Sequence, residues 1–413
     1  MYSTEMYDRY DQTDTGRLLR GEVPSDIGMV KRINHGTDAM LGFVSRQYLD
    51  FYIAKGGSKI KFITGRQGAG KTQFTRLFAD EALSRGYINV SLSAKEIWLH
   101  DFRELYLEVL RQSDLETVLQ GCASSIIREL GYDPGEIPEG QTLMDHLAGQ
   151  GLADALTRNE IRTALRQHFT KNPLLDNTFA SCCSLLTGSY LGHPVLEASS
   201  RDMLLAFMHG DKGVKLSQMR AIGLSPSRVT KHNARHLLRS LAETVHLAGY
   251  AGIVVTIDDM EILTQPRSEG IIRYTKTRRD DAYENIRQLI DDIDSMRYIM
   301  FMMAFDRELM DNESYGLKSY QALWFRIQSE VVSSRFNQFA DIIDLDRLAD
   351  QTLTPEALIE MSEKISLELS GRGIAAGPVT EEEAAALIER SEYGSLGLPY
   401  LLIRTMTEEG RAD

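Results

Sequence analysis

The segment Gly65-Arg-Gln-Gly-Ala-Gly-Lys-Thr72 constrains this chain more than any other part of its sequence. It fits the pattern G-x-x-x-x-G-K-[ST], in which glycines let backbone N–H groups surround phosphate groups. Both flanks suit the pattern, because an apolar stretch at 59–64 precedes it and apolar residues at helical spacing follow it over 73–83. Strand, glycine loop and helix in this order place a helix N-terminus at the phosphates. The segment therefore predicts a nucleotide-binding loop in an α/β fold.

The residues of this loop have separate expected tasks. Lys71 would reach the β- and γ-phosphates, and the Thr72 hydroxyl would bind Mg²⁺. An ordinary glycine-rich turn before a surface helix would leave the Lys-Thr pair unexplained. We therefore expect ATP and Mg²⁺ as cofactors. The nucleotide contacts are expected from Gly65, Gly68, Ala69, Gly70, Lys71, Thr72 and Gln73.

A second part of the same site is expected after the stretch 253–257. This stretch is continuously apolar, as is typical of a strand buried on both faces, and it ends in Asp258 and Asp259. Ligands bind at the carboxyl ends of strands in such sheets. Asp258 would complete the Mg²⁺ site, and either Asp259 or Glu261 would position the attacking water. Without the phosphate loop, these carboxylates would indicate only a polar turn that caps a strand.

The order of apolar and amphipathic segments predicts a parallel sheet sandwiched by helices. We expect an ATPase core over 59–345, a helical approach segment over 1–58 and a small helical C-terminal lid over 346–413. Helical periodicity predicts a large insertion at about 112–230 in the core. Further strands are expected at 87–92, 298–304 and 341–345, and helices in and around the insertion at 96–111, 115–130, 152–169, 201–208 and 233–247.

Composition excludes several classes of protein. The chain has 413 residues, 43% of them hydrophobic and 25% charged, which is typical of globular proteins. No apolar run is long enough to span a membrane, and the polar N-terminus does not resemble a signal peptide, so we expect a cytoplasmic protein. The 3 Cys lack the spacing of a metal site, and we expect buried free thiols. The net charge of -13 argues against a surface devoted wholly to nucleic acid.

A local basic segment is nevertheless a candidate for DNA binding. Residues 267–279 concentrate Arg and Lys around one aromatic residue, directly after the acidic strand end. Cations would contact phosphates and the Tyr274 ring would stack on a base. The alternative is a solvated loop neutralised by the acidic helix expected from Asp280 to Met296. The candidate DNA contacts are Arg273, Tyr274, Lys276, Arg278 and Arg279.

Several segments resemble, in order, the ATP-binding proteins of bacteriophage-exclusion (BREX) defence systems, of BrxD type. The resemblance is carried by residues 17–28, 61–72, 233–241, 248–253, 258–261, 282–292 and 316–323. It implies an AAA-like P-loop ATPase that forms a homo-oligomer and works with other proteins of an anti-phage system.

Four positions bear on how far the family pattern transfers. The family usually has Asp-Glu where this chain has Asp258-Asp259, so turnover would be slow or stimulated by a partner. Asp306 stands in the region where a γ-phosphate sensor is usually a small hydroxylated residue, and Gly397-Leu-Pro-Tyr400 lacks the expected lid Arg. Arg326 or Arg335 would act on the ATP of a neighbouring subunit, unless each is a structural surface Arg.

These observations favour an ATPase that acts as a molecular switch or as a loader of DNA or of a partner. A nucleotide-gated scaffold or oligomerisation module with little hydrolysis is the alternative. A kinase-like phosphotransferase is a third reading, but no residue pattern indicates a base for a phosphate acceptor. The insertion at 112–230 carries no functional motif and would suit the docking of a partner.

Overall fold

The computed structural model describes residues 13–264, 273–328 and 340–409 of the chain. At its centre is a five-stranded sheet of β1 (Ser58–Gly65), β2 (Tyr87–Ser93), β3 (Gly252–Asp258), β4 (Ile299–Asp306) and β5 (Ile342–Asp344). All neighbouring strands are parallel, in the order β2-β3-β4-β1-β5. The five strands lie where the sequence predicts them, and the predicted α/β class is confirmed.

The strand order brings distant residues to one edge of the sheet. β4 lies between β1 and β3, and Gly65 of β1 pairs with Asp306 of β4. On the other side of β3, Ser93 of β2 pairs with Asp258 of β3. These residues end their strands, and all the strands run in the same direction. The start of the phosphate loop and the carboxylates of β3 and β4 therefore share the carboxyl edge, where ligands bind in parallel sheets.

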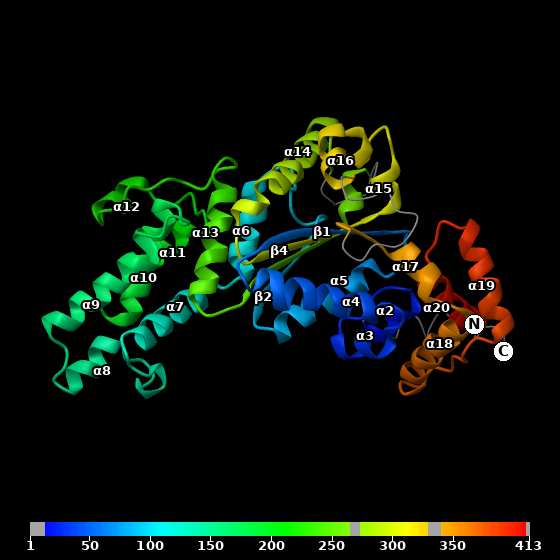
Figure 1. The fold of residues 1–413 in the computed structure, drawn as a ribbon, viewed down its shortest axis with the longest axis horizontal. Coiled ribbons are helices and arrows are strands. Elements are labelled where there is room, and N and C mark those ends of the chain that lie inside the picture. The colour runs from blue at the N-terminus through cyan, green and yellow to red at the C-terminus, as the bar shows by residue number, and fades with distance from the viewer. Residues whose placement is uncertain (1–12, 265–272, 329–339, 410–413) are drawn as a thin grey trace.

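Helices cover both faces of the sheet (Figure 1). On one face α4 (Asp38–Val44), a π-helical segment η1 (Ser45–Ile53) and α5 (Lys71–Ser84) pack on side chains such as Ile63 and Met300. On the other face α6 (Phe102–Gln112), α13 (Ala234–Leu247) and α14 (Lys276–Asp292) pack on side chains such as Phe62 and Phe301. Adjacent strand residues thus point into opposite cores, as the alternation of a pleated strand requires.

The long insertion forms a helical arm that projects from one end of the sheet (Figure 1). The arm consists of α7 (Leu115–Glu129), α8 (Leu143–Gly149), α9 (Ala155–Leu165), η3 (Arg166–Thr170), α10 (Asn177–Leu191), α11 (Ala198–Met208) and α12 (Leu216–Ala221). The sequence did not predict α8, α10 or α12. In α10 the apolar residues surround most of the helix, which leaves a weak periodic signal. Cys182 and Cys183 lie there, and with Cys122 they are the buried free thiols expected.

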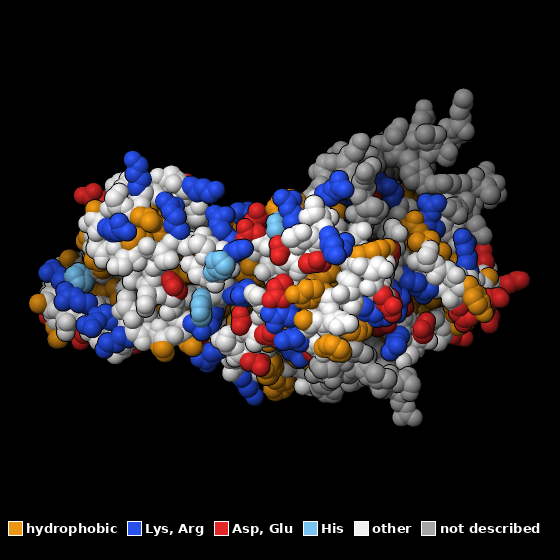
Figure 2. All heavy atoms as spheres, turned by 90° about the horizontal axis from the view of Figure 1, so that it is seen from above, with side chains coloured by type: hydrophobic (Ala, Val, Ile, Leu, Met, Phe, Trp, Pro, Cys, Tyr) orange, Lys and Arg blue, Asp and Glu red, His pale blue; other side chains and the backbone are white. Residues whose placement is uncertain are grey.

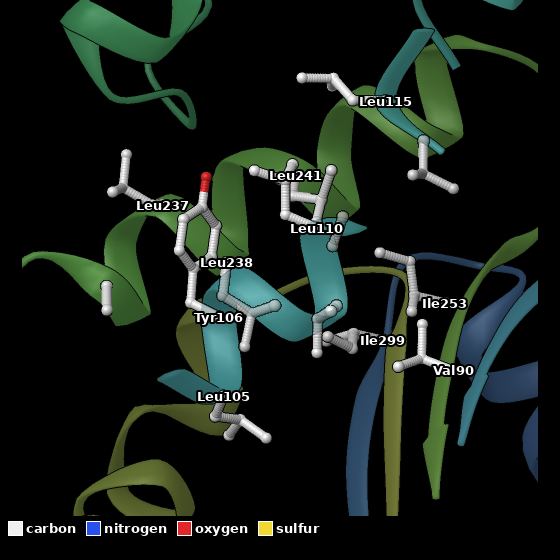
Figure 3. Packing of buried hydrophobic residues seen from close by; sticks show 14 of the residues in the cluster. Val90, Leu105, Tyr106, Leu110, Leu115, Leu237, Leu238, Leu241, Ile253 and Ile299 are labelled. Atoms are coloured by element: carbon white, nitrogen blue, oxygen red, sulfur yellow. The ribbon is translucent and has the colours of Figure 1, made fainter. Parts of the chain in front are cut away.

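Apolar side chains join the arm to the sheet (Figure 3). Tyr106 and Leu110 of α6 meet Leu237, Leu238 and Leu241 of α13, next to Val90, Ile253 and Ile299 of the strands. This continuous core gives the arm a fixed base on the sheet.

The two ends of the chain pack together beside the phosphate loop. The N-terminal α2 (Asp14–Leu19) and α3 (Ile27–Ile33) share one apolar core with α17 (Leu345–Thr352), α18 (Pro355–Ser370), α19 (Glu381–Tyr393) and α20 (Leu398–Glu409). Leu18 and Met29 lie in this core together with Leu358 and Leu402. Two short helices, α15 (Arg307–Asp311) and α16 (Gln321–Gln328), follow β4. None of the described helices has the length and apolar character needed to cross a membrane.

Candidate nucleotide-binding site

The phosphate loop turns from β1 into α5 through glycines that no other residue would replace easily. Gly68 has φ +78° and Gly70 has φ +92°, the left-handed region that glycine adopts without strain. A Cβ on Gly68 would also lie 2.3 Å from the Cβ of Tyr400 in α20. The loop therefore needs glycine both for its turn and for its contact with the C-terminal helices.

Lys71 is buried, and its ammonium group lies back over the loop. Nζ donates to the carbonyl oxygens of Gly65 at 3.2 Å and Arg66 at 3.1 Å. It also forms an ion pair with Asp306 at the end of β4. The sequence suggested Asp306 only as a weak sensor candidate, and the structure makes it the carboxylate partner of the phosphate-loop lysine. An arriving triphosphate would compete with Asp306 for Lys71.

The predicted Mg²⁺ ligands lie together. The Thr72 hydroxyl donates to Oδ2 of Asp258 at 2.5 Å. Burial raises the pKa of Asp258, and the Thr72 hydrogen bond opposes that shift. A hydroxyl and a carboxylate suit Mg²⁺, which commonly takes one or two protein oxygens and fills its shell with phosphate and water. The pair thus fits the cofactor that the sequence predicts.

The two candidates for positioning water have different surroundings. Asp259, with φ 61°, accepts a hydrogen bond from Ser93 Oγ at 2.7 Å and forms an ion pair with Lys95. Glu261, on the short 3₁₀ helix η4 (Met260–Leu263), has a buried oxygen, Oε2, without a hydrogen-bond partner. Burial and then the charge of Asp306 raise the pKa of Glu261 to about 7. Glu261 therefore has an oxygen available for water, whereas the Asp259 carboxylate is occupied.

A cavity of about 380 Å³ adjoins the loop. Its walls come from the loop, from the N-terminal segment around α2 and α3, and from α18 and α20. Most of the lining side chains are apolar: Leu18, Val23, Pro24, Ile33, Met361, Ile365, Pro399, Tyr400 and Ile403. Arg76 also lines it and donates to the carbonyl oxygen of Pro24 at 2.6 Å. A flat apolar group attached to phosphates would fit such a space.

The C-terminal helices are bonded directly to the phosphate loop. The Gly397 N–H donates to the Gln67 carbonyl at 2.8 Å, and a Cβ on Gly397 would lie 2.4 Å from the Ala69 nitrogen. Arg66 pairs with Asp346 of α17 at 3.1 Å and donates to Ser391 Oγ of α19 at 3.1 Å. Sequence reasoning missed Arg66, because the motif allows any residue at that position. Gln73, a predicted nucleotide contact, lines the cavity, and its side chain donates to Asn34 at 3.1 Å.

The basic segment predicted to bind DNA is arranged differently from the expectation. Tyr274 is buried, and its hydroxyl accepts from the Leu99 N–H at 2.7 Å, which argues against stacking on a base. The helix begins at Lys276 rather than Asp280, so Arg278 and Arg279 lie in its first turns, over the rings of Trp98 and Tyr315. Arg273 and Lys276 are exposed, and residues 267–272 lie outside the described residues.

The two arginines considered for a neighbouring subunit also differ from each other. Arg326 forms an ion pair with Asp291 of α14 and donates to the Ala322 carbonyl at 2.8 Å. Arg335 lies outside the described residues.

Comparison with known proteins gives one family. Residues 15–394 match the family described as BREX system ATP-binding protein BrxC/D. No curated protein and no solved structure matches the chain significantly.

Proposed function

The chain belongs to the BREX system ATP-binding protein family, and we propose that it is an AAA-like ATPase that binds and hydrolyses ATP. The observation that carries the proposal is the convergence of Lys71, the Thr72–Asp258 pair and Glu261 at one sheet edge, beside an apolar cavity. In this proposal hydrolysis drives a molecular switch, or the loading of DNA or a partner, in a multi-protein anti-phage system.

Each residue of the site has its own role in the proposed hydrolysis of ATP. Lys71 would leave Asp306 and hold the β- and γ-phosphates, while Thr72 and Asp258 would hold Mg²⁺. The cation would supply positive charge against the phosphate oxygens. Glu261 would orient the attacking water through its unpartnered oxygen, and its raised pKa would make it a stronger base than an ordinary carboxylate. The adenine ring would enter the apolar cavity.

The contacts between loop and lid support a switch. Gly397 is hydrogen-bonded to Gln67, and Arg66 reaches α17 and α19, so a change in the loop on nucleotide binding would move the C-terminal helices. In a homo-oligomer, a neighbouring subunit could contact the C-terminal helices and respond to this movement. Arg326 would act on the ATP of such a neighbour only after its ion pair with Asp291 breaks.

The test is phosphate release by purified protein, compared between wild type and Lys71→Ala. Lys318→Ala is the matched control, because Lys318 pairs with Asp311 of α15 and not with a residue of the phosphate loop. We expect release by wild type and the control, and a loss of about 100-fold or more in Lys71→Ala. Equal release by all three proteins would contradict the proposal.

Two observations favour the second candidate, a nucleotide-gated scaffold with little hydrolysis. Asp259 is held by Ser93 and Lys95, and the end of β4 carries the carboxylate of Asp306 instead of a hydroxyl. Tight ATP binding without phosphate release, lost in Lys71→Ala, would support this candidate over the ATPase.

A further inference from the structure

The stretch from α9 to the first half of α13 carries a positive charge that the rest of the chain does not share. Residues 151–240 contain 12 Lys and Arg against 6 Asp and Glu, a net charge of +6, in a chain whose net charge is -13. The remaining residues therefore carry -19. Figure 2 shows Lys and Arg gathered on the arm with few Asp and Glu between them. Residues 115–150, the α7 and α8 part of the arm, contain 1 Lys or Arg against 6 Asp and Glu, so the positive charge belongs to the part of the arm that begins at α9. That part attracts polyanions.

One helix face concentrates this charge. Arg158 and Arg162 of α9 and Arg166 at the start of η3 recur every four residues and are all exposed. The spacing predicts a row of cations about 12 Å long, at a rise of 1.5 Å per residue. Thr157, Ile161 and Leu165 form the parallel buried row that fixes the helix on the arm. We call Arg158, Arg162 and Arg166 the arginine row.

The arginine row is not neutralised within the chain. None of its three members has a carboxylate partner among the described residues, whereas each of four other arginines has at least one: Arg66, Arg85, Arg287 and Arg307. The only side-chain contact of the row in the described part of the chain joins Arg162 Nη2 to His193 Nε2 at 3.4 Å. Burial and then the charges of Arg162 and Arg158 lower the pKa of His193, so it stays neutral and leaves the row accessible.

The surroundings of the row favour a duplex over a single strand. Proteins that hold single strands stack exposed aromatic rings on the bases. The exposed large aromatic residues of the described chain are Phe51, Tyr52, Phe325 and Tyr393, all outside the arm, whereas Phe169 and Phe179 of the arm are buried. Unpaired arginines without aromatic rings can bind phosphates but cannot read bases.

We propose that the arginine row of the arm binds the phosphate backbone of double-stranded DNA without sequence preference. The exposed cations Lys171, Lys212, Lys215, Arg220 and Lys231 of the arm add to the attraction. This surface is separate from the phosphate loop, and it replaces residues 273–279 as the candidate DNA contact. It deepens the proposed loading function by naming the partner, yet binding through it requires no ATP hydrolysis.

The experiment measures fluorescence anisotropy of a short labelled duplex of random sequence, titrated with full-length protein between about 50 and 200 mM salt. The variant Arg158→Gln/Arg162→Gln/Arg166→Gln is compared with Arg46→Gln/Lys55→Gln/Arg390→Gln, which removes three exposed cations away from the arm. We expect the arm variant to bind more weakly and to lower the salt slope by about 3, at 0.9 per lost contact. The control should bind as wild type does.

Three results would overturn the proposal: no duplex binding by wild type at low salt, an unchanged slope in the arm variant, or binding of a single-stranded probe alone. Arg162→Glu provides a second variant with one changed position, and it should also weaken binding. Nucleotide-dependent thermal stabilisation of each variant checks folding. Lys71→Ala should keep duplex binding, so that failure of the ATPase proposal and failure of this one are distinguishable.

Discussion

Positively charged side chains have carboxylate partners at the phosphate-loop edge of the sheet, whereas those in the arginine row of the arm do not. At the sheet edge Lys71 and Arg66 lie among carboxylates and carbonyl oxygens that β4 and α17 hold in place. In the arginine row of the arm, Arg158, Arg162 and Arg166 are exposed and have no carboxylate partner among the described residues. Removing a group at the sheet edge leaves a buried partner unsatisfied, so single changes there should have large effects. Exposed charges act additively and are screened by salt, so their effects should be small and cumulative.

The largest expected effect comes from Glu261→Gln. We expect phosphate release to fall by about 100-fold or more, because the variant loses the carboxylate that orients water, while ATP binding is kept. Asp259→Asn is the matched isosteric control, since its carboxylate is already held by Ser93 and Lys95. A steady-state phosphate assay with ATP-binding calorimetry separates the two residues. Loss of turnover in Asp259→Asn, with Glu261→Gln active, would reverse the assignment.

The pH dependence tests the same residue in the wild type. Because the pKa of Glu261 is about 7, kcat/KM should rise with pH through that value as the base loses its proton. The folded protein binds this proton more tightly than the unfolded chain does, so stability should fall as pH rises from 4.5 to about 7. Glu261→Gln should remove this loss. Relative to wild type, its free energy of unfolding should be higher by at most about 3 kcal/mol above pH 7 and unchanged by this cause below pH 4.5. Thermal unfolding at several pH values measures it.

Gly397→Ala should have the next largest effect. Its methyl group would lie 2.4 Å from the Ala69 nitrogen, which forces the lid and the phosphate loop apart. We expect ATP affinity to fall about tenfold, since small displacements of binding groups are costly. The control Gly377→Ala adds the same methyl group where no atom lies within 4 Å. Calorimetric affinities that match between the two variants would show that the lid does not set the shape of the loop.

Asp306→Asn should change affinity by less and in the other direction. Wild-type Lys71 must leave Asp306 before it can bind phosphate, and the freed carboxylate then repels the triphosphate. The amide removes both penalties, so we expect ATP to bind about fivefold more tightly, with apo thermal stability reduced. Titration with ATP at constant salt tests this. Weaker binding would indicate that the Asp306 carboxylate attracts the bound cation.

The sequence predicted the sheet edge far better than the arm. Continuously apolar strands and the glycine loop are local signals, and they located all five strands and the Thr72–Asp258 pair. The pairing of Lys71 with Asp306 depends on β4 lying between β1 and β3, which no local pattern contains. The contact of Gly397 with the loop likewise joins segments far apart in sequence.

At the basic segment and on the arm, the surroundings of individual side chains depend on contacts that no local pattern contains. The sequence predicts that the Tyr274 ring stacks on a base, but the ring packs against Trp98 and the hydroxyl accepts a hydrogen bond from the Leu99 N–H. On the arm, periodicity predicts a helix over 152–169, and the structure has α9 and η3 there. The spacing of Arg158, Arg162 and Arg166 became informative only when the structure showed all three exposed and without carboxylates.

The smallest effect is expected from a single change in the arginine row. Arg162→Gln should lower the salt slope of duplex binding by about 1 and weaken binding only a few-fold, because it removes one phosphate contact among several. Lys31→Gln is a suitable control, since Lys31 already pairs with Asp80 and lies outside the arm. If Arg162→Gln abolished binding as completely as Lys71→Ala abolishes turnover, Arg162 would not be one of several equivalent cations. The arm would then hold a specific site built like the sheet edge, and the contrast between the two regions would not hold.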